Sequence, residues 1–189
     1  KSKPAIVVIS RQHSGETMAS FVTEGFVNSL IEQNHLTEKL LDNFSILIFP
    51  LLNKSGAEKG YHRVNANGTD LNRSWNNNDV QEIKFVKNIL SSYSNIHSII
   101  DIHGDEISNF NYVYYDENSG NGFQQHFLES LNNSSPKIVS LPKQQYFKRF
   151  IKHLIRKRKI LTETGLTLSD FARKEYKARA YTIEVSAKT

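Results

Sequence analysis

The chain has no cysteine among its 189 residues, and it has only four prolines and one methionine. Without cysteine no disulfide can form, and any metal site must use histidine or carboxylate ligands. No run of about 18 apolar residues is present, so we expect no membrane-spanning helix. The N-terminus shows no hydrophobic signal segment, which together with the lack of cysteine predicts a cytoplasmic location.

The composition is that of an ordinary globular protein. Hydrophobic residues make up 38% and charged residues 23%, and the formal net charge is +5. A chain of this length can bury a core of its own, so we expect residues 1–189 to form a single catalytic domain. The small positive charge favours acidic partners without identifying one.

Apolar segments alternate between the period of a strand and the period of a helix. Strands followed by helices predict an α/β fold, a three-layer sandwich with a mostly parallel, mixed central sheet and helices on both faces. We expect strands over Ala5–Ser10, Ser45–Phe49, His97–Ile102, Tyr112–Tyr115 and Tyr181–Val185, and helices over Thr17–Gln33, Asp79–Tyr93 and Gly122–Leu131. Ser45–Phe49 is expected to be a buried strand.

Two histidines and a glutamate stand at the ends of predicted strands. His13 and Glu16 follow Ala5–Ser10, and His103 follows His97–Ile102. Ligands collect outside the carboxyl ends of parallel strands. Two imidazoles and one carboxylate are a common ligand set for catalytic zinc, with the fourth position open to water. Taken singly, each residue also has a plainer interpretation: Glu16 as a favourable charge at a helix N-terminus, and each histidine as a strand-end or loop residue.

Four motifs in order resemble the zinc carboxypeptidases. His13-Ser14-Gly15-Glu16 is similar to their H-x-G-E motif, and Pro50–Trp75 is similar to P-x-x-N-x-x-G, G-x-x-R-x-N and G-x-D-x-N-R-x-W. Asp101–Glu106 resembles the strand with their last zinc ligand, and Tyr181–Glu184 resembles their T-x-E strand. The sequence His103–Glu106 most resembles that of the bacterial and cytosolic-type branch of the family.

The resemblance implies a role for each matching residue. One zinc ion per chain would be bound by His13, Glu16 and His103, and Asp70 would hydrogen-bond a ligating histidine. Glu184 would be the general base and Arg63 would stabilise the oxyanion. Asn72 and Arg73 would bind the terminal carboxylate of a peptide or protein tail. The implied activity is zinc-dependent hydrolysis of the C-terminal peptide bond.

The sequence departs from the family pattern in three places. The region Ile160–Leu166 has no tyrosine where many members carry one that closes over the substrate. The residue that lines the specificity pocket falls between Leu168 and Asp170, and either of these two could fill the role. The chain is also short, so we expect a compact or truncated variant, with an additional domain outside it as one explanation.

Other functions stay open at this stage. A related zinc amidohydrolase that removes acyl groups from small amino acids would share the zinc motifs, and a catalytically inactive binding domain would share the fold. Tyr146–Lys159 predicts an amphipathic basic helix, which is typical of a solvated surface and also suits acidic substrates or nucleic acid. No aromatic recognition motif accompanies it, so no nucleic-acid partner is expected.

Overall fold

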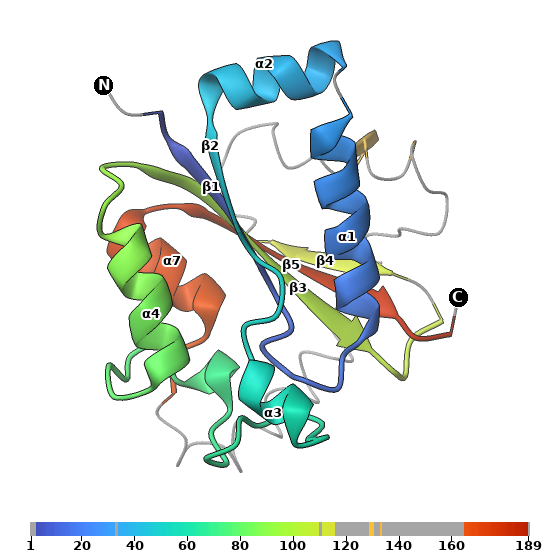
Figure 1. The fold of residues 1–189 in the computed structure, drawn as a ribbon, viewed down its shortest axis with the longest axis vertical. Helices are drawn as coiled ribbons and strands as arrows, with labels where there is room; N and C mark the ends of the chain where they lie inside the picture. Colours follow the sequence, from blue (N-terminus) through green and yellow to red (C-terminus); the bar gives the residue numbers. More distant parts are fainter. Residues whose placement is uncertain are drawn as a thin grey trace.

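A five-stranded sheet runs through the centre of the molecule (Figure 1). The computed structural model describes residues 3–32, 34–109, 111–115, 129–130, 133 and 165–188. The strands are β1 (Ala5–Ser10), β2 (Ser45–Phe49), β3 (Ile96–Asp105), β4 (Tyr112–Tyr115) and β5 (Arg179–Ser186), in the spatial order β2-β1-β3-β5-β4. All neighbouring strands are parallel except β4, which runs antiparallel to β5 at one edge.

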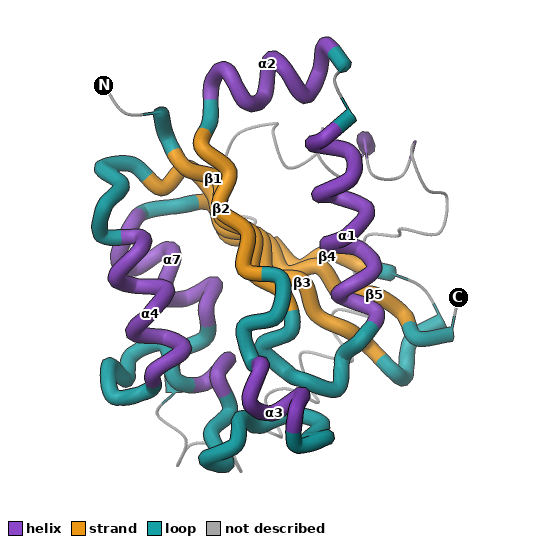
Figure 2. Tube along the Cα trace, in the orientation of Figure 1, coloured by secondary structure: helices purple, strands orange, loops and turns teal. Residues whose placement is uncertain are grey.

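Helices cover both faces of this sheet, so the predicted α/β sandwich with a mostly parallel, mixed sheet is confirmed. Helix α1 lies on one face, and α4 and α7 lie together on the other, as Figures 1 and 2 show. The helices are α1 (Met18–Ile31), α2 (His35–Asn43), α3 (Lys54–Glu58), α4 (Gln81–Leu90) and α7 (Leu168–Tyr176), with a 3-10 turn at Leu71–Arg73. None of the described helices has the length and apolar character needed to cross a bilayer.

The larger part of the core lies between the sheet and α4 and α7. Apolar side chains recur on one side of each of these helices, and Ile83, Val86 and Leu90 of α4 are fully buried. Trp75 and Leu168 join the same cluster without any exposed surface. This packing holds β1, β3 and β5 against the two helices.

Several local expectations need correction. Strand β2 is half-buried along its whole length rather than buried, because it lies at the edge of the described sheet. Strand β3 continues to Asp105, so His103 lies within the strand and not after it. Helices α2 and α7 were not predicted, although each begins with a side-chain cap, from Asn34 and Thr167 respectively. Helix α3, capped by Asn53, was not predicted either.

Two further expected helices fall largely where the structure gives no description. Of the range 122–131, only residues 129 and 130 are described, and they are helical. The basic segment 146–159 lies entirely outside the described residues, as do residues 160–164 of the region without a tyrosine.

Candidate metal centre

A tight turn after β1 brings His13 and Glu16 to the same point. It begins at Arg11, whose positive φ of 59° is uncommon for a residue with a side chain. The Arg11 guanidinium folds back over the turn and donates hydrogen bonds to the Ser14 carbonyl and to Ser20 Oγ. Gly15 N donates to the His62 carbonyl at 2.7 Å, so closely that a Cβ at Gly15 would lie 2.9 Å from that oxygen.

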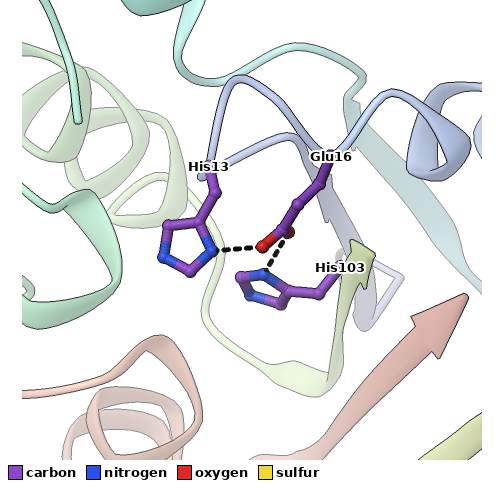
Figure 3. Close-up of side chains that lie close together, drawn as sticks. All are labelled: His13, Glu16 and His103. Carbon is purple, nitrogen blue, oxygen red and sulfur yellow. Dashed lines mark hydrogen bonds and ion pairs between the residues drawn. The ribbon is translucent and has the colours of Figure 1, made fainter. Parts of the chain in front are cut away.

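The three expected metal ligands meet at the carboxyl ends of β1 and β3. Glu16 Oε1 lies 2.7 Å from His13 Nδ1, and Glu16 Oε2 lies 2.9 Å from His103 Nδ1 (Figure 3). All three residues are buried. One potential ligand atom from each lies within 4.8 Å of the others, which is close enough for a single ion to contact all three. Within the described part of the chain, this is the one group of three or more histidine, aspartate or glutamate side chains with that geometry.

The outer ring nitrogens both face aspartates. His13 Nε2 lies 3.2 Å from Asp70 Oδ1, and His103 Nε2 lies 2.9 Å from Asp101 Oδ2. Metal-binding histidines commonly donate the proton of their second nitrogen to a carboxylate, which leaves the other nitrogen free for the metal. Both histidines thus present Nδ1 inward in the same way, and the residues present fit a divalent ion such as zinc.

The cluster concentrates opposite charges away from water. Burial alone would lower the pKa of His13 and of His103, but the neighbouring carboxylates outweigh it and raise both pKa values. Burial likewise opposes ionisation of Glu16, yet hydrogen bonds with the two histidines hold its pKa far below its usual range. The pKa of Asp70 falls to about 2 because His13 and Arg63 outweigh its burial. These pKa shifts favour the protonated form of both imidazoles and the ionised form of Glu16 and Asp70.

Glu184 lies on β5 directly beside His103, with which it is in register. Burial raises the pKa of Glu184 to about 7, and the negative charges of Glu16 and Asp101 add to that effect. The charge of His103 acts in the opposite direction. A carboxyl group whose pKa lies near neutrality is well suited to exchange protons during a reaction.

The remaining expected site residues surround this centre. Arg63 is exposed, and its Nε donates to Asp70 Oδ2 at 2.7 Å. Asn72 Nδ2 lies 3.1 Å from His103 Nε2, while Asn72 Oδ1 accepts from Leu168 N. Arg73 Nη1 donates to the Asn72 carbonyl at 2.7 Å. Asp70, Asn72 and Glu184 thus lie next to the three expected ligands, whereas Arg63 contacts Asp70 and Arg73 contacts the Asn72 backbone.

The two candidates for lining the specificity pocket both lie in the first turn of α7. Leu168 is fully buried in the core cluster. Asp170 lies in the first turn of α7, where it contacts Thr167 Oγ1 and Arg173.

Comparison with known proteins agrees with this geometry. A sequence model described as zinc carboxypeptidase matches residues 1–189. The chain belongs to the zinc carboxypeptidase family. This member of the family is 38% identical over 77 residues to cytosolic carboxypeptidase 1 of Gallus gallus, a match that covers 41% of the chain and 6% of that protein. It is 34% identical over 110 residues to the protein ZMO1242 of Zymomonas mobilis. That match covers 56% of the chain and 29% of that protein.

Solved structures of carboxypeptidases have the same fold as this family member. The metallo-carboxypeptidases of Burkholderia cenocepacia and Pseudomonas aeruginosa each match with a TM-score of 0.75 and 25% identity, over 98% of the chain. Murine aminoacylase 3 matches at a TM-score of 0.56 and 14% identity, which is a likeness of fold alone. The chain spans about half of the two bacterial carboxypeptidase chains, 48% and 49% respectively.

Proposed function

We propose that this chain is a zinc-dependent carboxypeptidase that hydrolyses the C-terminal peptide bond of peptides or protein tails, and that residues 1–189 act as one catalytic domain. The observation that carries the proposal is the convergence of His13, Glu16 and His103, with Glu184 in register beside His103. Membership of the zinc carboxypeptidase family supports hydrolysis as the reaction and zinc as the metal.

His13, Glu16 and His103 would hold one zinc ion per chain. A zinc ion bound in this way acidifies a water molecule and polarises a carbonyl group. Asp70 orients the His13 ring from the outer nitrogen. The three ligands come from two separate segments of the chain, so the folded sheet and turn arrange them before the metal arrives.

Glu184 accepts a proton from the attacking water and delivers it to the amine that leaves. Because burial raises the pKa of Glu184, its ionised form is a stronger base than an exposed carboxylate. Arg63 lies on the far side of Asp70 from His13, and its fixed positive charge stabilises negative charge that develops on the carbonyl oxygen.

Asn72 and Arg73 bind the free carboxylate of the substrate, which restricts cleavage to the chain end. Arginine suits this task because its planar guanidinium can donate two parallel hydrogen bonds to a carboxylate. A substrate whose terminal carboxylate is amidated loses that pairing. The proposed partner is therefore a peptide or protein C-terminus.

The experiment that tests this function is digestion of a peptide set in which each sequence is made with a free and with an amidated C-terminus. We expect release of single C-terminal residues from the free forms only. Replacement of Arg73 by lysine keeps the charge but loses the paired donors, so kcat/KM should fall about 10–100-fold, mostly through KM. Lys174→Arg, on the exposed side of α7, serves as the control and should leave the kinetics unchanged.

Two outcomes would redirect the assignment. Equal cleavage of free and amidated peptides would exclude recognition of the terminal carboxylate. Hydrolysis of acylated amino acids without cleavage of any peptide would favour the amidohydrolase reaction, for which the fold likeness to murine aminoacylase 3 is the reason to include such substrates. Cytoplasmic location stays a prediction, as does the possible additional domain.

A further inference from the structure

A buried chain of hydrogen bonds runs from the core to the outer nitrogen of His103. Trp75 Nε1 donates to Gln12 Oε1 at 2.8 Å. Gln12 Nε2 lies 2.8 Å from both carboxylate oxygens of Asp101. Asp101 Oδ2 in turn lies 2.9 Å from His103 Nε2. Trp75, Gln12 and Asp101 are each at most 1% exposed, so water cannot substitute for any partner.

The direction of this chain is fixed at both ends. The indole of Trp75 can only donate, so the Gln12 amide must turn its oxygen toward Trp75 and its NH₂ group toward Asp101. A carboxylate only accepts, so the Asp101 oxygens accept from Gln12 Nε2 and from the Nε2 proton of His103. The donor at Trp75 therefore fixes the orientation of the Gln12 amide, and Asp101 accepts hydrogen bonds from both Gln12 and His103.

Asn72 contacts the same ring nitrogen but does not change this direction. Its Nδ2 lies 3.1 Å from His103 Nε2, and its amide orientation is fixed because Oδ1 accepts from Leu168 N. Both groups are donors when Nε2 carries a proton, so they touch without a hydrogen bond. Asn72 presents no acceptor to Nε2, so Asp101 Oδ2, at 2.9 Å, is the acceptor for that proton.

We propose that Asp101, held by Gln12 and Trp75, is a positioning residue that keeps the proton of His103 on Nε2 and presents Nδ1 to the metal. This inference rests on the proposed zinc site. It concerns a different side of the centre from Asp70, which contacts His13. Asp70, which faces His13 Nε2, is partly exposed. Asp101, which faces His103 Nε2, is buried and is held by the buried side chain of Gln12.

Two isosteric single variants break the chain of donors and acceptors. Asp101→Asn places an NH₂ group among groups that donate, because Gln12 and His103 both donate to this position. Gln12→Glu places one carboxylate against another. In each case we expect zinc affinity to fall about 10–100-fold, the usual effect of losing an outer partner of a metal-binding histidine.

The double variant Gln12→Glu with Asp101→Asn supplies the decisive comparison. The glutamate at position 12 accepts from Trp75 with one oxygen and from the new asparagine NH₂ with the other, and the asparagine oxygen accepts from His103. Each donor again faces an acceptor, with the negative charge on residue 12 instead of residue 101. We therefore expect the double variant to bind zinc more tightly than either single variant, which is a non-additive recovery.

The measurement is zinc affinity by competition with a chromophoric chelator, together with ¹H–¹⁵N spectra of the His103 ring in the zinc-loaded proteins. Wild type and double variant should show a slowly exchanging proton on Nε2, and the single variants should lose it. Wild-type affinity in both single variants, or no recovery in the double variant, would overturn the positioning role. If wild type itself binds no zinc, the proposed function fails instead, so the two failures are distinguishable.

Discussion

Replacement of Glu184 by glutamine is expected to lower kcat by about 10²–10⁴-fold while zinc remains bound. Glutamine has nearly the same shape but cannot accept the proton of the attacking water. Glu184 is not among the three side chains that converge on the metal position, so its loss should leave zinc affinity close to that of wild type. The check is kcat for one peptide substrate, measured beside zinc content in the same preparation.

The pH dependence of this reaction has a definite sign. Burial raises the pKa of Glu184 to about 7 in the metal-free protein, and a bound cation lowers it again. The base works only when ionised, so kcat should fall as the pH is lowered through its pKa. Glu175→Gln, on the exposed side of α7, is the matched control and should retain the wild-type kcat and its decrease at low pH. A Glu184→Gln variant with wild-type kcat would rule out this residue as the base.

Replacement of Glu16 by glutamine is expected to abolish activity through loss of the metal. Glutamine presents one neutral oxygen and an NH₂ group that cannot bind a cation, so the site loses its only anionic ligand. We expect zinc affinity to fall by more than the 10–100-fold typical of outer-sphere changes, that is, by more than about 100-fold. Titration with zinc, followed by activity at saturating metal, measures the effect.

The Glu16→Gln variant also tests how the cluster is held without metal. The two histidines have raised pKa values because they face carboxylates, so removal of Glu16 leaves buried positive charge with fewer partners. Thermal unfolding of the metal-free form distinguishes this loss of stability from a loss of zinc alone. Glu24→Gln, on an exposed position of α1, should match wild type in both assays. Undiminished zinc binding by Glu16→Gln would remove Glu16 from the ligand set.

The sequence contained enough to predict the sheet because strand patterns are local. Alternating or continuous apolar runs mark β1, β3 and β5, and the residues that follow or end them gather at one edge of a parallel sheet. His13 and His103 are separated by about ninety residues, yet their strands are neighbours, with Ser10 in register with Ile102. The order of the strands therefore brings His13 and His103 to the same edge of the sheet.

The partners of the histidines were only partly predictable. Asp70 and Asp101 both stand within motifs, but the resemblance implies a contact with a ligating histidine only for Asp70. Asp101 lies two residues before His103 on a strand, and alternate strand residues share a face. The local sequence does not indicate that Gln12 contacts Asp101 or that Trp75 contacts Gln12, because these contacts depend on how α4 and α7 fill the core around Trp75. Long-range packing of this kind has no period in the sequence.

Short capped helices were missed for a similar reason. Helix α7 has only nine residues, and its Thr167 side chain accepts a hydrogen bond from Asp170 N. The family pattern predicts that a residue between Leu168 and Asp170 lines a specificity pocket, and it does not predict that a helix begins there. The buried position of Leu168 arises from packing against the sheet, which a local pattern does not contain.

A crystal structure of the zinc-loaded protein, with anomalous scattering recorded at the zinc edge, tests the metal centre most directly. We predict one strong peak per chain, in contact with Nδ1 of His13, Nδ1 of His103 and the Glu16 carboxylate, at about 2.0–2.2 Å from each. A peak bound elsewhere, or zinc-soaked crystals with no peak between these three side chains, would contradict it.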